Sequence, residues 1–199
     1  MSIVWRLPLP LTIGLLCMVL AGCTSATPSS GESSPDFGSI TLKEAQKYGA
    51  DPSQITILEK GEVSYPDYEA AVNRSLQCMR DAGISVIDPV PNNNEGITLL
   101  NYGWSSTLPG MTEDQGYALG DDCLKRFSYW VEQLYQLQPS SLEAMERHFD
   151  QYRDAVVQCI RTNGGTVRDD ATRDEAALAA IDVENQTGVD CFRELGLSL

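Results

Sequence analysis

The chain has 199 residues, with 14 lysines and arginines against 28 aspartates and glutamates, and a formal net charge of −14. This charge argues against nucleic acid as a partner, because binding phosphates requires clustered Lys and Arg. A single histidine excludes a metal site built from several histidines, and we expect neither a metal nor a cofactor. The hydrophobic content of 42% predicts a folded chain and not a disordered one.

The first 22 residues have the features of a secretory signal peptide. Arg6 is the only charged residue before Glu32, and residues 7–22 are almost entirely apolar. This run is shorter than the roughly 20 residues that a transmembrane helix needs, and it fits the hydrophobic region of a signal peptide. It ends in the sequence Leu-Ala-Gly-Cys at positions 20–23.

This ending resembles the lipobox of bacterial lipoproteins. In that family the cysteine thiol receives a diacylglyceryl group, a peptidase cuts before the cysteine, and the new amine is acylated. The resemblance implies lipidation at Cys23 and a location on the extracytoplasmic face of the cell membrane, since two or more acyl chains anchor a protein stably. The alternative is a plain signal peptide followed by a coincidental cysteine.

The segment after the lipobox predicts a spacer between membrane and body. Residues 23–39 are rich in Ser, Thr, Pro and Gly, which favours a flexible tether with its ends roughly 20 Å apart. The body then divides into a first half, 40–139, and a second half, 140–199, expected to pack as one compact domain. A body this acidic should not bind an anionic lipid surface by itself, so the acyl anchor supplies the membrane affinity.

The first predicted elements of the body are two helices. A capping box at 41–44 and Gly49 delimit a short helix. Ser64 is a suitable N-cap for a longer helix that runs to about Ala82. The apolar face of this second helix consists of Tyr68, Val72, Ser75, Leu76 and Met79.

A β-hairpin is predicted next. Two apolar runs, 84–90 and 97–104, flank the turn sequence PNNNEG, which is typical of a hairpin with a long turn. Pro89 and Pro91 restrict the first strand to a sheet edge, because proline cannot donate a ladder hydrogen bond.

Three more helices are predicted in the rest of the chain. A capping box at 112–115 begins one that reaches about Leu137, and serine capping at 140–143 begins the next, which ends at the Asn-Gly-Gly of 163–165. The latter carries an apolar seam with alternating spacings of 3 and 4: Leu142, Met145, Phe149, Tyr152, Val156 and Cys159.

The last helical region begins at the capping box 172–175 and reaches about Leu195, with a break at Gly188. Together the elements predict an α+β fold that is mainly helical, with a small β-hairpin and two pseudo-repeat, disulfide-bonded halves.

The body cysteines are even in number. With Cys17 in the signal peptide and Cys23 lipidated, four remain: Cys78, Cys123, Cys159 and Cys191. An even number in an exported chain predicts disulfides, and four cysteines allow three pairings.

An internal repeat helps to choose among these pairings. Segment 76–86, LQCMRDAGISV, and segment 157–167, VQCIRTNGGTV, share Gln, Cys, Arg, Gly and Val without a gap. Asp-Cys-Leu-Lys at 122–125 is similarly echoed by Asp-Cys-Phe-Arg at 190–193. The simplest pairing joins the two cysteines within each half. The main rival joins like cysteines across the halves.

These motifs resemble small secreted proteins and lipoproteins of actinobacteria, most of them of unknown function. The matching pattern is [YF]-x-x-A-V-x-x-x-x-x-C-[ML]-R-x-x-G followed by a helical cysteine element. It is carried by Tyr68, Ala71, Val72, Cys78, Met79, Arg80 and Gly83, with Cys123 and Cys191 as partners. The resemblance implies an architecture and a location, and it carries no catalytic residues.

Tyr102 and Trp104 are the candidate ligand contacts. Both lie in the insert 87–110, which is the larger of the two inserts between paired cysteines. Rigid aromatic area beside polar residues suits a binding surface for an envelope protein or a glycan. The alternative is that Trp104 fills the core beneath the hairpin.

Catalytic patterns are weak in this chain. The acidic pairs at 121–122 and 169–170 could in principle serve acid–base chemistry, but adjacent helical residues point about 100° apart. A nucleophilic pair with His148 would need a free thiol. We therefore expect a non-enzymatic binding or scaffolding module. An envelope hydrolase that acts on peptidoglycan or glycan through acidic residues is the alternative.

Overall fold

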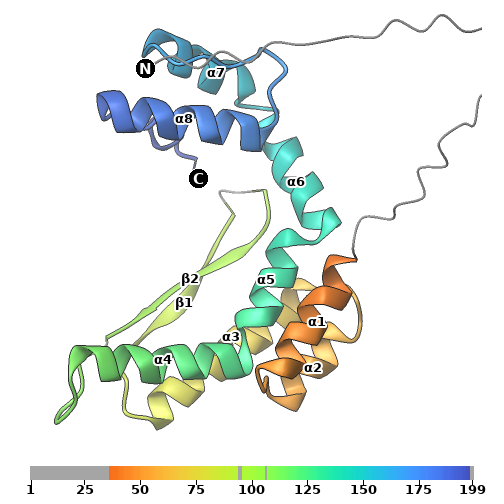
Figure 1. The fold of residues 1–199 in the computed structure, drawn as a ribbon, viewed down its shortest axis with the longest axis vertical. Helices are drawn as coiled ribbons and strands as arrows, with labels where there is room; N and C mark the ends of the chain where they lie inside the picture. The colour runs from red at the N-terminus through yellow and green to blue at the C-terminus, as the bar shows by residue number, and fades with distance from the viewer. Residues whose placement is uncertain (1–35, 94–95, 106, 198–199) are drawn as a thin grey trace, which may run out of the picture. The chain divides into compact units, whose positions relative to one another are not determined.

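The structure, a computed structural model, describes residues 36–93, 96–105 and 107–197 (Figure 1). The expected signal peptide, Cys23 and most of the expected tether lie outside these residues. In chain order the elements are α1 (Phe37–Lys47), α2 (Pro52–Leu58), α3 (Tyr65–Asp81), β1 (Val86–Asn92), β2 (Leu99–Trp104), α4 (Glu113–Phe127), α5 (Tyr129–Leu137), α6 (Pro139–Phe149), α7 (Arg153–Thr162), α8 (Arg173–Thr187) and the 3₁₀ helix η1 (Arg193–Leu195). The predicted α+β, mainly helical fold is confirmed.

Helix α1 begins earlier than predicted. Its N-cap is Asp36, whose carboxylate accepts a hydrogen bond from the Gly38 N–H at 3.2 Å. Thr41, the expected cap, lies inside the helix, and its hydroxyl donates to the Phe37 carbonyl oxygen at 2.8 Å. The start at 41 was therefore wrong, because an earlier aspartate caps the helix. The last residues of the expected tether, 37–39, belong to α1.

Helix α3 forms as predicted. Its N-cap Ser64 accepts from the Asp67 N–H at 3.3 Å, and Gly83 follows its C-cap with a φ of +84°. The five residues of the predicted apolar face are all buried. Four of them, all except Ser75, lie in a core cluster that α2, α4 and α5 also line.

The hairpin is antiparallel, with β1 residue Ile87 opposite Gly103 and an irregular register between Ile87 and Val90. Two stacked tyrosines from the helices, Tyr68 and Tyr135, have ring centroids 4.5 Å apart. The Tyr68 hydroxyl accepts from the Leu100 N–H, and the Tyr135 hydroxyl donates to the carbonyl of residue 98, each at 3.0 Å. These bonds join the β2 side of the hairpin to the helical core.

The predicted helix over 112–137 is two helices. Its start is correct, since Thr112 and Gln115 form a complete capping box. However, α4 ends at Phe127 and α5 begins at Tyr129, with Ser128 at φ −137° and ψ −32° between them. The prediction of one continuous helix was wrong, and the cause lies elsewhere in the chain.

The fully buried Gln54 of α2 stabilises this break. Its amide nitrogen donates to the carbonyls of residues 125 and 126, at 3.1 and 3.0 Å. Its amide oxygen accepts from the N–H groups of residues 130 and 131, at 2.7 and 3.1 Å. One side chain therefore satisfies backbone groups on both sides of the break.

The second predicted long helix is also divided. Helix α6 ends at Phe149 and α7 begins at Arg153, so the expected seam does not run along one continuous helix. Phe149 is buried, whereas Leu142 is 45% exposed. Ser140 does not cap α6, because its hydroxyl donates to Glu62.

A second core cluster is formed by the last residue of α6 and the chain that follows it. Its buried members are Phe149, Val156, Ile160, Ala171, Ala176, Ala180, Val183, Cys191 and Phe192. Helix α8 begins with the predicted capping box and ends at Gly188, whose φ is +77°. The predicted break at Gly188 is therefore present, and the short η1 ends at Leu195, where the helical region was expected to end.

The disulfides join cysteines within each half, as the repeat predicted. Cys78 in α3 is bonded to Cys123 in α4, and Cys159 in α7 is bonded to Cys191 before η1. The rival pairing across the halves is excluded. The two Asp-Cys elements differ locally, because Cys123 lies within a helix and Cys191 in a turn.

The structure extends the repeat beyond the matching letters. Arg80 forms an ion pair with Asp88 at 2.6 Å, and Arg161 forms one with Asp169 at 2.6 Å. Both aspartates lie eight residues after their arginine. Each half thus closes the turn after its first cysteine helix with the same pair of charges.

Candidate functional site

Tyr102 is half-buried and points to the helices. Its hydroxyl donates to the two carboxylate oxygens of Glu132 on α5, at 3.0 and 3.2 Å. Burial raises the pKa of the Glu132 carboxyl, while hydrogen bonds from the Ser128 and Tyr102 side chains partly offset that increase. Burial and the neighbouring carboxylate raise the pKa of Tyr102 far above its usual value. The hydrogen bonds of Tyr102 to Glu132 therefore hold the hairpin to α5.

Trp104 is also half-buried and packs against the first core cluster. Its indole lies on α4 at Gly120, where an added Cβ would come within 2.5 Å of the indole Nε1. The indole therefore fits only because position 120 has no side chain. The contacts agree with the alternative reading of Trp104 as a side chain packed beneath the hairpin.

The exposed apolar area of the insert lies on β1 instead. Ile87 is 70% exposed and Val90 is 62% exposed. Neither residue was predicted as a contact, although the position of Val90 between Pro89 and Pro91 in an edge strand is a usable signal of exposure. On β1 the insert thus presents Ile87 and Val90 outward, whereas Tyr102 and Trp104 on β2 face the helices.

Among the described residues, Glu132 is the carboxyl with properties closest to those of a catalytic acid. A half-buried carboxyl with a raised pKa suits proton donation. Its oxygens, however, are engaged by Tyr102. The acidic pairs from the sequence lie elsewhere and do not join it: Asp121 and Asp122 are exposed on α4, and Asp169 is paired with an arginine.

His148 is half-buried at the end of α6. Its ring contacts the Tyr152 ring, with centroids 5.3 Å apart. The four body cysteines are in disulfides, so none offers the free thiol that a cysteine–histidine pair requires.

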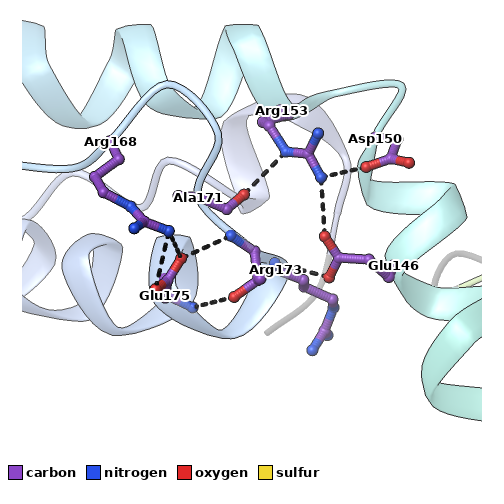
Figure 2. A network of polar contacts seen from close by, with 8 residues as sticks. Glu146, Asp150, Arg153, Arg168, Ala171, Arg173 and Glu175 are labelled. Atoms are coloured by element: carbon purple, nitrogen blue, oxygen red, sulfur yellow. Dashed lines mark hydrogen bonds and ion pairs between the residues drawn. The ribbon is translucent and has the colours of Figure 1, made fainter. Parts of the chain in front are cut away.

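A polar network connects α6, α7 and α8 (Figure 2). Arg153 forms ion pairs with Glu146 and Asp150 and donates to the Ala171 carbonyl. The second Glu146 oxygen accepts from the Arg173 N–H at 2.9 Å, at the start of α8. A helix N-terminus attracts anions, and here the protein's own carboxylate occupies that position.

A cavity of about 360 Å³ adjoins this network. Its lining consists of Leu142, Met145, Glu146, Thr172, Arg173 and Asp174. Glu146 is already bonded to Arg153 and to the α8 backbone. Its contacts therefore connect α6 to α7 and α8 and serve the fold.

Two searches for special features concern only the described part of the chain. No three His, Cys, Asp or Glu side chains gather there into a group that could hold a metal ion. No helix there has both the length and the apolar character needed to cross a bilayer. Comparison of the chain with protein families, curated proteins and solved structures finds no match.

Proposed function

We propose that this protein is a lipid-anchored binding or scaffolding module on the extracytoplasmic face of a bacterial membrane, of the actinobacterial lipoprotein type that it resembles. The observation that carries the proposal is the order of the N-terminal sequence, in which an apolar run ends in Leu-Ala-Gly-Cys with its cysteine at position 23.

The disulfides support an extracytoplasmic location. Cys78–Cys123 and Cys159–Cys191 use every body cysteine. Structural disulfides form and persist in oxidising compartments and are rare in the cytosol. A chain with this arrangement needs export to reach its stable form.

The hairpin insert is the proposed contact surface for an envelope protein or a glycan. The half-buried Tyr102 and Trp104 fix the hairpin on the helices, and β1 presents Ile87 and Val90 to solvent. Binding energy at an interface is usually concentrated in a few of its side chains. In this arrangement Tyr102 and Trp104 contribute to binding by fixing the position of the hairpin.

One observation favours the alternative, an envelope hydrolase of peptidoglycan or glycan. The raised pKa of Glu132 would suit a general acid. Glycoside hydrolysis requires two carboxyls about 5 to 10 Å apart. In the structure the Glu132 carboxylate accepts a hydrogen bond from the Tyr102 hydroxyl. Turnover of labelled peptidoglycan that Glu132→Gln abolishes would establish the hydrolase.

The anchor is tested by a pair of cysteine variants in the same apolar segment. Cys23→Ser should abolish incorporation of labelled palmitate and leave an unprocessed precursor or a released protein. Cys17→Ser is the matched control, because it removes a thiol from the predicted signal peptide. It should be acylated and processed normally. A processed, palmitate-labelled and membrane-bound Cys23→Ser protein would refute the anchor.

A further inference from the structure

Exposed apolar side chains gather on α1 and α5. Tyr48 is 63% exposed, and Phe37, Ile40, Tyr129 and Leu137 are between 36% and 42% exposed. With the half-buried Trp130 these residues form what we call the α1–α5 strip.

The strip is continuous because the two helices pack side by side (Figure 1). Tyr48 stacks on Trp130, with ring centroids 5.8 Å apart, and Trp130 meets Tyr129 edge-on at 4.8 Å. Phe37, Ile40 and Tyr48 are spaced for one side of α1, and Leu137 lies seven residues after Trp130 on α5.

The strip is also nearly neutral in a strongly acidic chain. Helices α1 and α5 together carry Lys43 and Lys47 against Glu44 and Glu132, and Glu132 is turned toward the hairpin. Lys43 and Lys47 are exposed beside the apolar residues, where long lysine stems can keep their charge in water. Tyr, Trp and Lys beside aliphatic residues suit the interface between lipid and water.

The strip begins where the described chain begins. Asp36, the N-cap of α1, is the thirteenth residue after Cys23. Fully extended, the chain between them spans at most about 45 Å. An acylated Cys23 would hold α1 near the bilayer at an effective concentration in the millimolar range, so even weak contact with lipid would be populated.

From these observations we infer that the α1–α5 strip lies on the lipid surface of the membrane. This inference rests on the proposed anchor at Cys23. Glu132 and Trp130 are two residues apart on α5 and therefore lie on different faces. Contact through Trp130 consequently leaves the hairpin, which Glu132 holds, accessible to a partner.

The two tryptophans of the body allow a direct test in the full, acylated protein. Trp104→Phe leaves Trp130 as the reporter after signal removal, and Trp130→Phe leaves Trp104. Each variant is reconstituted in phosphatidylcholine vesicles with brominated acyl chains, which quench nearby indoles. We expect about a twofold loss of Trp130 fluorescence and a clearly smaller loss for Trp104. Equal quenching or none overturns the inference.

A second pair of variants separates lipid contact from other causes. In the Trp104→Phe background, Ile40→Glu places a charge in the strip and should remove the quenching. Ile87→Glu, at a still more exposed site on β1, should leave it unchanged. If reconstitution lowers the access of aqueous iodide to Trp130 below that of the protein without lipid, and bromolipid does not quench it, another protein copy covers the strip and the inference is wrong.

Mass spectrometry measures the acylation of Cys23, and vesicle flotation measures attachment to lipid; both are independent of the quenching. An acylated protein that floats without quenching overturns the lipid contact alone. A chain that is neither acylated nor floating overturns both the contact and the anchor.

Discussion

At the scale of single residues, Gln54 determines more of the fold than its sequence position suggests. Its amide serves four backbone groups at the α4–α5 break and is fully buried. The local sequence around 128 contains neither glycine nor proline to mark a break. The break could not be predicted there, since the side chain that stabilises it lies more than 70 residues earlier.

Gln54→Ala should lower the free energy of unfolding by about 3 to 5 kcal/mol, because it leaves buried backbone groups unpaired. Chemical denaturation measures the change. Gln46→Ala, at an exposed position on α1, is the control and should change stability by less than about 0.5 kcal/mol. Equal effects of the two variants would contradict this role.

Glu132 should make stability depend on pH. Because burial raises its pKa above the usual 4.5, the folded state binds a proton more readily than the unfolded state. The free energy of unfolding therefore falls as pH rises from that value through the raised pKa. Glu132→Gln can still accept the Tyr102 hydrogen bond and carries no charge.

We therefore expect Glu132→Gln to be more stable than the wild type at neutral pH and to lose this part of the pH dependence. Denaturation curves between pH 4 and pH 8 measure it. Glu59→Gln, at an exposed position, serves as the control. A variant less stable than wild type at neutral pH would show that the charged form of Glu132 stabilises the fold.

At the scale of elements, the hairpin depends on Trp104 and on the glycine beneath it. Trp104→Ala should cost about 3 kcal/mol by loss of packing. Ile87→Ala, on the exposed side of β1, should change stability by less than about 0.5 kcal/mol. Thermal unfolding distinguishes them. An unchanged melting temperature for Trp104→Ala together with lost ligand binding would instead support direct contact by Trp104.

The elements with local signals were predictable from sequence. Ser64, Thr112 and Thr172 cap the helices that they were expected to cap, because capping is decided within four residues. The start of α1 and the helix breaks at 128 and 150–152 could not be predicted in this way. Competing caps, buried partners far along the chain and turns without glycine produce them. The same limit applies to Trp104, whose packing depends on Gly120.

At the scale of the whole molecule, each half has a disulfide and a core cluster of its own. Replacing Cys159 and Cys191 together by serine should cost about 4 kcal/mol on the chain-entropy account. Hydrogen exchange should then increase mainly in α7 and α8, while α3 stays protected. A uniform increase along the chain would show that the halves unfold as one unit.

The proposed function depends on an acylated Cys23 that anchors the body to the membrane. The most direct measurement is the mass of the N-terminal peptide of the protein isolated from its native membrane. We expect a peptide that begins at Cys23 and carries a diacylglyceryl group on the thiol. A mature chain that begins at another residue, or at Cys23 with an unmodified thiol, would contradict it.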